Sequence, residues 1–267
     1  MKIKALIIGI NHYNGIESLN GCENDAKDWE KLLINYYNVC PSNIIRLRYR
    51  YETKSDYILK VFKKFIHNLK NEQLGIFIFS GHGVIEKKEV GNKIIIEERI
   101  RVVDRTITDQ EIRERLDPLK DKAKLISIID SCFSGGVEFY KDGLCNIDDS
   151  IKNKYLKSKT YEASNKVINP TNKEIIYKNF FKDISTLNRL TLTASKNNEE
   201  AFEDIIKNRF NGIFSRYLID VLKNDPLITY KEAISILQKK LPDLSKEYLQ
   251  TPQYLNESGI INQTFFN

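Results

Sequence analysis

An α/β fold, with a mainly parallel sheet and helices on both of its faces, is what this sequence predicts. Strand-like apolar runs and helix-like patterns alternate along the chain, which is typical of parallel strands joined by crossover helices. Of the 267 residues, 41% are hydrophobic and 29% are charged, so the chain can bury a substantial core. We find no internal repeat and no boundary between domains, and we therefore expect one domain over residues 1–267.

Five elements are expected before His82. They are a strand over Ile3–Ile10, a helix over Asn24–Tyr37, a strand over Ile44–Tyr49, a helix that begins near Thr53, and a strand over Gly75–Ser80. Apolar residues at helical spacing indicate both helices, for example Trp29 and Leu33 in the first. Thr53 and Asp56, three residues apart, predict a cap at the start of the second helix.

Beyond His82 the pattern predicts a small hairpin and then further helices and strands. The hairpin is expected to pair Ile94–Ile96 with Ile100–Val103 across a charged turn. The later elements are a helix from a capping box of Thr108 and Glu111 to Leu116, strands over Leu125–Asp130 and Arg189–Ser195, a helix marked by Phe210, Phe214, Leu218 and Leu222, a helix from a capping box of Thr229 and Glu232 to Pro242, and an edge strand within Thr251–Leu255. Residues 137–188, rich in Lys and Asn, are expected to form an insertion or linker.

Two of these strands lead directly to reactive side chains. The apolar run Leu125–Ile129 leads to Cys132, and the run Gly75–Phe79 leads to His82, which has a glycine on either side. In doubly wound sheets, chemistry gathers beyond the carboxyl ends of the strands. We therefore expect Cys132 to be a nucleophile and His82 to be its general base and acid.

The pairing of a thiol with an imidazole fits nucleophilic catalysis. A thiol with a pKa of about 8.5 is mostly protonated at neutral pH and needs a base to activate it. Side chains at the ends of adjacent strands, about 4.8 Å apart, can meet. The amides of Gly83 and Cys132 are candidate donors to the oxyanion that forms when a peptide carbonyl is attacked. The alternative is structural: Cys132 as a buried core thiol and His82 as a polar residue at a strand end.

These motifs resemble those of the caspase-like cysteine peptidases, in particular the metacaspases and the prokaryotic caspase homologues. Ser80-Gly81-His82-Gly83 resembles the catalytic-histidine motif and Asp130–Gly135 the nucleophile motif, and the interval of fifty residues from His82 to Cys132 is that of caspases. Further segments resemble the family in the same order: Leu19–Ala26, Leu192–Ser195 and Gly212–Ser215. The resemblance implies a caspase-like, mainly parallel six-stranded sheet and a cysteine endopeptidase with a His-Cys dyad.

The resemblance also implies a preference for basic substrates. In metacaspases, the aspartates that match Asp25 and Asp130 line an acidic pocket for the residue before the cleaved bond, P1. Two carboxylates beside the thiol would attract Lys or Arg and repel an acidic side chain. The structural alternatives are a helix N-cap for Asp25 and a hydrogen bond at the strand end for Asp130.

No metal or other cofactor is expected. Many metacaspases bind calcium through clustered aspartates after the catalytic histidine, whereas this chain has Glu86, Glu89, Glu97, Glu98 and Asp104 there, interleaved with basic residues. An activating partner is compatible with the family pattern, but the sequence does not identify one.

Residues 141–188 occupy the place of a linker that family members often cleave. Lys152, Lys154, Lys157 and Lys159 would suit self-cleavage by a protease specific for basic residues, and an unprocessed solvated insertion is an equal alternative. The net charge of +6 comes from basic residues spread along the chain, so we expect no nucleic-acid partner.

The expected location is the cytoplasm. No apolar run approaches the roughly 18 residues of a membrane span, and the start lacks a signal-peptide cleavage site. Cys22, Cys40, Cys132 and Cys145 are too few for a disulfide scaffold and are expected to be reduced thiols, with Cys22 and Cys40 in the core or near the surface. Besides the endopeptidase, the alternative function is a catalytically silent caspase-like interaction module. Nucleic-acid binding through the Lys-rich insertion is a third hypothesis, which the spread of the basic residues disfavours.

Overall fold

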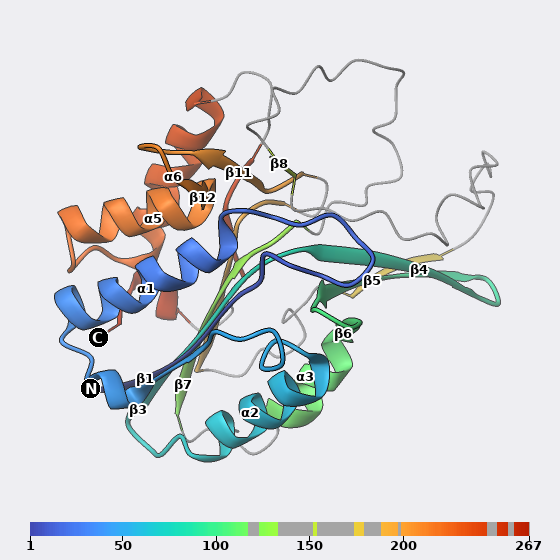
Figure 1. Cartoon of the computed structure of the whole chain (residues 1–267), viewed down its shortest axis with the longest axis horizontal. Coiled ribbons are helices and arrows are strands. Elements are labelled where there is room, and N and C mark those ends of the chain that lie inside the picture. Colours follow the sequence, from blue (N-terminus) through green and yellow to red (C-terminus); the bar gives the residue numbers. More distant parts are fainter. Residues whose placement is uncertain are drawn as a thin grey trace.

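A computed structural model of the chain describes residues 1–116, 123–132, 152–153, 174–178, 188–196, 199–244, 250–255 and 259–266. Its centre is a six-stranded sheet, which confirms the predicted fold class (Figure 1). In spatial order the strands are β13 (Gln253–Leu255), β10 (Arg189–Thr193), β7 (Lys124–Asp130), β3 (Gln73–Ser80), β1 (Lys2–Gly9) and β2 (Ile44–Leu47). All neighbours pair in parallel except β13, the antiparallel edge strand.

Helices cover both faces of this sheet, as the sequence predicts (Figure 1). On one face lie α1 (Cys22–Tyr37), α5 (Ile213–Asn224) and α6 (Tyr230–Leu244), and on the other lie α2 (Ser55–His67) and α3 (Asp109–Leu116). Successive residues of a strand point to opposite faces. Accordingly Ala5 and Ile7 of β1 belong to the core cluster of Trp29, whereas Leu6 and Ile8 belong to that of Phe62.

A second, smaller sheet extends from the residue after His82. It contains β4 (Gly83–Val90), β5 (Lys93–Arg101), β6 (Thr106–Thr108) and β9 (Glu174–Lys178). The predicted hairpin of Ile94–Ile96 with Ile100–Val103 is wrong, because β5 is one continuous strand that pairs with β4. Its buried residues alternate along the strand, and the turn falls instead at Gly91, whose φ of +59° suits glycine.

A third sheet lies beside α5. It consists of β12 (Phe210–Gly212), β11 (Phe202–Ile205) and β8 (Lys152–Asn153). Of the expected insertion over 137–188, β8, β9 and Asn188 are described, and its remaining residues lie outside the described ones. The single-domain expectation therefore stays a prediction.

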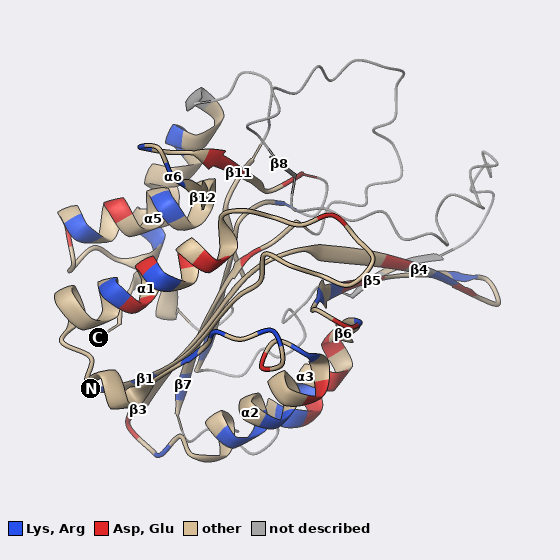
Figure 2. Cartoon of the chain, in the orientation of Figure 1, with Lys and Arg blue, Asp and Glu red and all other residues tan. Residues whose placement is uncertain are grey.

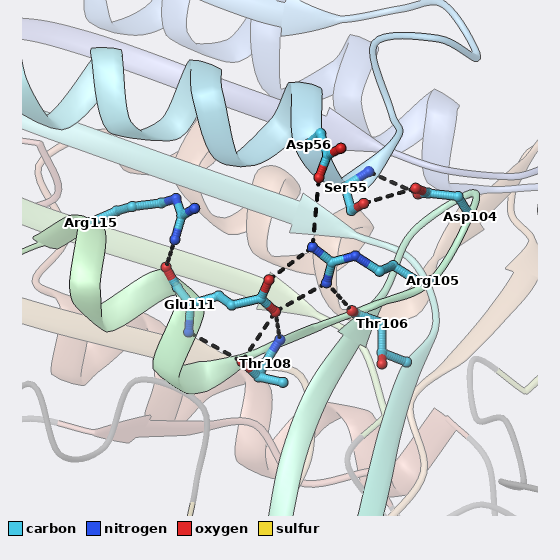
Figure 3. Close-up of polar contacts among 8 residues, drawn as sticks. All are labelled: Ser55, Asp56, Asp104, Arg105, Thr106, Thr108, Glu111 and Arg115. Atoms are coloured by element: carbon cyan, nitrogen blue, oxygen red, sulfur yellow. Dashed lines mark hydrogen bonds and ion pairs between the residues drawn. The ribbon is translucent and has the colours of Figure 1, made fainter.

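The predicted cap is confirmed at α3 and wrong at α2. At α3 the capping box is confirmed: the Thr108 amide donates to Glu111 at 2.9 Å, and the Glu111 amide donates to the Thr108 hydroxyl at 3.2 Å. At α2 the predicted cap is wrong, because the Thr53 hydroxyl donates to the carbonyl of Arg50 in the preceding turn. Asp104 takes its place and accepts bonds from both the amide and the hydroxyl of Ser55, each at 2.8 Å (Figure 3).

Other element boundaries shift by a few residues. The helix expected from Asn24 begins at Cys22, and Phe210 lies in β12, before α5. The capping box of Thr229 and Glu232 is confirmed, and α6 continues past Pro242 to Leu244. Two short 3₁₀ helices, Pro41–Asn43 and Ile260–Asn262, complete the described elements.

Charged residues of both signs occur on the helices. Figure 2 shows Lys and Arg interspersed with Asp and Glu on α1, α3 and α5, whereas the charged residues of α2 are mainly Lys. Across the described part of the chain, every helix is too short or too polar to traverse a lipid bilayer.

Candidate active site

The register between β3 and β7 aligns the two predicted catalytic residues. Ser80, the last residue of β3, is paired with Asp130, the last residue of β7. His82 and Cys132 each follow two residues later, at the same edge of the sheet. Their backbones meet there, since a Cβ atom on Gly83 would lie 1.9 Å from the carbonyl oxygen of Cys132. Only a glycine fits at position 83.

His82 is held from the loop that follows β1. Its Nε2 lies 3.0 Å from the carbonyl oxygen of Glu17, and its ring packs against the Tyr13 ring with centroids 4.9 Å apart. The hydroxyl of Tyr13 also accepts a hydrogen bond from the His82 amide at 2.9 Å. A carbonyl can only accept, so the bond to Glu17 requires the proton on Nε2 and makes Nδ1 the basic nitrogen of the neutral ring.

Cys132 is fully buried, with an exposed fraction of 0%. Its Sγ donates to the carbonyl oxygen of Ala201 at 2.9 Å and accepts from the amide of the same residue at 2.8 Å. Ala201 directly precedes β11. The thiol of this conformation is therefore covered by backbone that sequence reasoning did not connect with it.

Asp25 lies in the first turn of α1 and points inward. Its carboxylate accepts hydrogen bonds from the Ser80 hydroxyl at 2.7 Å, from the Asn211 side chain at 2.9 Å, and from the Gly212 amide at 2.9 and 3.1 Å. The N-cap of α1 is Gly21, so the alternative of Asp25 as the N-cap of its own helix is wrong.

Asp130 reaches the same helix end as Asp25. Its Oδ2 accepts the amide of Ser215 at 3.0 Å, which is a strand-end hydrogen bond of the kind the structural alternative describes. Gly212 is the N-cap of α5 and Ser215 lies in its first turn. The two aspartates thus supply carboxylates to the α5 N-terminus, where amide groups and the helix dipole favour negative charge.

A third buried carboxylate, Glu203, joins this region. Its two oxygens accept the amides of Asn20 at 2.8 Å and Gly21 at 2.7 Å, directly before α1. The exposed fraction of Asp25, Asp130 and Glu203 is 0%. Glu203 lies within the short strand Phe202–Ile205, and its neighbours in sequence do not indicate that its carboxylate binds the amides before α1.

None of the cysteines in the described part of the chain forms a disulfide. Cys22 is buried and Cys40 exposed, and Cys145 lies outside the described residues. Within the described ranges, no three His, Cys, Asp or Glu side chains converge as a metal site would require.

Comparison with known proteins identifies the family. The family described as metacaspase, peptidase C14 domain, matches residues 3–138, a range that contains all four of Asp25, His82, Asp130 and Cys132.

Two curated relatives illustrate the range of similarity. Metacaspase-1 of Plasmodium falciparum is 34% identical over 145 residues, which are 49% of this chain and 24% of that protein. Metacaspase-1 of Schizosaccharomyces pombe is 24% identical over 289 positions, which cover 94% of this chain and 66% of that protein. The chain therefore spans from about a quarter to about two thirds of the length of these relatives.

Solved structures share the fold at low sequence identity. Protein GSU0716 from Geobacter sulfurreducens has a TM-score of 0.70 at 18% identity, with 100% of this chain and 99% of that one covered. Caspase-1 from Spodoptera frugiperda has a TM-score of 0.59 at 12% identity, with 96% of this chain and 87% of that one covered. The expected resemblance is thereby confirmed, and the chain belongs to the metacaspase family of C14 peptidases.

Proposed function

We propose that the chain is a cysteine endopeptidase in which Cys132 is the nucleophile and His82 the general base and acid. The observation that carries the proposal is the register of β3 and β7, which gives both residues the same offset from a paired Ser80 and Asp130. Family membership supports the same chemistry. Nucleophilic catalysis requires a base near the thiol and a third group that orients the base, and the Glu17 carbonyl suits the latter role.

The proposed steps use these two residues. Nδ1 of His82 takes the thiol proton, the sulfur of Cys132 attacks the substrate carbonyl, and the imidazolium gives the proton to the leaving amine. Water, deprotonated by His82, then hydrolyses the resulting thioester, which releases the carboxylic product and restores the thiol. The amides of Gly83 and Cys132 are the proposed donors to the oxyanion. The absence of a side chain at Gly83 is demanded by the contact with Cys132, which brings the backbone of the two segments together.

Asp25 and Asp130 are proposed to select Arg or Lys at P1. Both carboxylates lie beside the strand ends that carry the dyad, and Ser80 connects them, since it is paired with Asp130 and bonded to Asp25. A guanidinium offers the charge and the donors that such a pair of carboxylates prefers. Substrate would have to share oxygens that now bind the amides of Gly212 and Ser215.

Hydrolysis of short fluorogenic peptides tests the proposal. We expect a peptide with Arg at P1 to be cleaved at least about a hundredfold faster than its Asp counterpart. Cys132→Ala and His82→Ala should each lower the rate by about a thousandfold or more. Asp130→Asn, which keeps an oxygen for the Ser215 amide, should reduce the preference for Arg. Equal rates for the two peptides would refute the basic P1 preference, and activity retained in Cys132→Ala would refute the dyad.

A second candidate, a catalytically silent interaction module, is favoured by one observation. The thiol of Cys132 is fully buried and bonded to Ala201. A peptide with Arg at P1 and an electrophile in place of the scissile bond separates the two functions. The endopeptidase is expected to be labelled at Cys132, and the silent module is expected to stay unlabelled under every condition that keeps it folded.

Self-processing within 141–188 and independence of calcium are further proposals. Incubation of the purified chain beside its Cys132→Ala variant should yield fragments from the active form alone if self-cleavage occurs. Addition of calcium to chelator-treated protein should leave the rate unchanged, and a large gain in activity would contradict that expectation. The proposed substrates are proteins or peptides, acted on in the cytoplasm by a single domain, and neither a nucleic acid nor a membrane has a part in the reaction.

A further inference from the structure

The cover over Cys132 is a short segment with its own anchors. Residues 199–202, here called the latch, run from Glu199 through Ala201 to the start of β11. Ala201 itself is fully buried and contacts the sulfur through both its amide and its carbonyl. The latch therefore places peptide backbone where an attacked peptide bond of a substrate would have to lie.

Two residues just before β13, Gln250 and Thr251, hold the latch. Glu199, with 4% of its surface exposed, accepts the Thr251 amide at 2.6 Å and the Thr251 hydroxyl at 2.9 Å. Gln250, also buried, accepts the Phe202 amide at 3.3 Å and donates to the Ala194 carbonyl at 3.2 Å. These bonds fasten both ends of the latch to the β13 edge of the main sheet, where Thr193 is paired with Gln253.

This contact covers the sulfur and engages it on both sides. The thiolate is the nucleophile, and it cannot donate a hydrogen bond. The Ala201 carbonyl oxygen, 2.9 Å from the sulfur, accepts from the protonated thiol and disfavours the thiolate, whereas the Ala201 amide, at 2.8 Å, donates to the sulfur and acts in the opposite direction. The inhibition therefore follows from the blocked access to a sulfur that is fully buried.

We propose that the latch is an autoinhibitory contact, and that Cys132 becomes reactive when the bonds of Glu199 and Gln250 release Ala201 from the sulfur. The inference rests on the proposed function, since it regulates the same nucleophile. Opening moves the Ala201 backbone away and frees the edge where His82 and Cys132 lie. Substrate or another ligand that engages the segment around Thr251 would open the site through the same bonds.

Alkylation by iodoacetamide tests the latch without any need for peptide hydrolysis. The full chain is treated with the reagent, and each cysteine is followed by mass spectrometry of its peptide. Cys40 is a built-in reference, because it is exposed and its hydrogen bond with Ser42 lowers the pKa of its thiol. In the wild-type chain we expect Cys132 to react at least about tenfold more slowly than Cys40, since it reacts only from the open state.

Glu199→Ala and Glu232→Ala form a matched pair of variants. Each removes a glutamate that accepts the amide and hydroxyl of one threonine, Thr251 in the first case and Thr229 in the second. Because each net hydrogen bond corresponds to about a fivefold change in population, Glu199→Ala should speed alkylation of Cys132 by about tenfold or more. Glu232→Ala, at the start of α6, should leave it unchanged. Peptidase activity should likewise rise in Glu199→Ala and stay unchanged in Glu232→Ala.

A milder variant protects the test against misfolding. Thr251→Val keeps the size and the amide and removes the hydroxyl alone, so we expect about a fivefold increase in the alkylation rate of Cys132. Circular dichroism shows whether the Glu199→Ala chain folds. If it does not fold, the alkylation rate of Cys132 in Thr251→Val tests the latch instead.

Two outcomes would overturn the latch. One is a wild-type Cys132 that reacts as fast as Cys40, and the other is an alkylation rate that neither latch variant changes. A chain with the expected alkylation pattern that cleaves no peptide would retain the latch and contradict the proposed function instead.

Discussion

The N-termini of α3 and α5 solve the same problem in different ways. At α3 the unpaired amides are met by neighbours in sequence: Glu111 bonds Thr108, and Arg105 adds an ion pair to Glu111 at 2.8 Å (Figure 3). At α5 the N-cap is Gly212, and the carboxylates come from Asp25 in α1 and Asp130 in β7. The first arrangement is partly exposed, whereas the carboxylates of the second are fully buried.

This difference links stability to the site. The α3 cap serves its own helix, and its loss leaves groups that water can reach. The α5 cap ties three elements together at the edge where His82 and Cys132 lie, and its loss leaves buried donors without an acceptor. The same two aspartates are proposed to bind substrate, so folding and recognition draw on the same oxygens.

The largest loss of stability is expected when the α5 cap loses Asp25, which lies far from α5 in the sequence. Asp25→Ala leaves the Ser80 hydroxyl, the Asn211 amide group and the Gly212 amide without this acceptor, so we expect the free energy of unfolding to fall by about 3 kcal/mol. Urea denaturation measures it. A loss no larger than that of an exposed cap would show that the buried bonds at α5 do not differ from local ones.

Removal of the local cap at α3 should have a smaller effect. Glu111→Ala removes the bond to Thr108 and the ion pair with Arg105, for which we expect a loss of about 1–1.5 kcal/mol. Peptidase activity should be retained, because α3 packs on the face of the sheet opposite to α1 and α5. A large loss of activity would mean that the two helix ends are coupled.

The α2 cap gives a pH-dependent version of the same comparison. Partial burial opposes ionisation of Asp104, but the hydrogen bonds from the amide and hydroxyl of Ser55 outweigh it, so the pKa of Asp104 lies below its ordinary value. A carboxyl with a lowered folded-state pKa stabilises the fold above its unfolded pKa of about 3.9 and loses this contribution as the pH falls further. Asp104→Asn should therefore be less stable than wild type at pH 7, and the gap should close below about pH 4. Thermal melts over this range measure it, and a gap independent of pH would argue against the charge.

The smallest loss of stability is expected from removal of the cap at α6. Glu232 accepts both Thr229 bonds on an exposed surface, and Glu232→Ala should lower the free energy of unfolding by less than Glu111→Ala does. The same chemical denaturation experiment applies. An effect equal to that of Asp25→Ala would remove the distinction between exposed and buried caps.

Local signals in the sequence predict the parts of the fold that depend on neighbours. The capping boxes at Thr108 and Thr229, the buried strands, and the offset of His82 and Cys132 from their strands all follow from spacing within a few residues. The cap of α2 by Asp104 does not, because it joins Ser55 to a residue 49 positions away.

The unpredicted part of the site has the same cause. Glu203 binds Gly21 across 182 positions, and Ala201 contacts Cys132 across 69, so each bond depends on how the sheets assemble. The predicted hairpin failed for a local reason, since the charged Glu97-Glu98-Arg99 looked like a turn. In the structure Glu98 is buried within β5, and a polar residue on a strand face hides the strand from a pattern based on hydropathy.

The alignment of β3 with β7 has a consequence for deletions far from the site. Seven residue pairs, from Leu74 with Lys124 to Ser80 with Asp130, hold the two strands in step. Loss of one residue such as Ile126 would either turn the following side chains to the wrong face or shift the strand by about 3.3 Å. In the second case the sulfur would move one full residue past the imidazole while every reactive group remained present. The pairing of the two buried strands thus sets the distance between His82 and Cys132. A deletion in the core could abolish the proposed activity although both residues are still present.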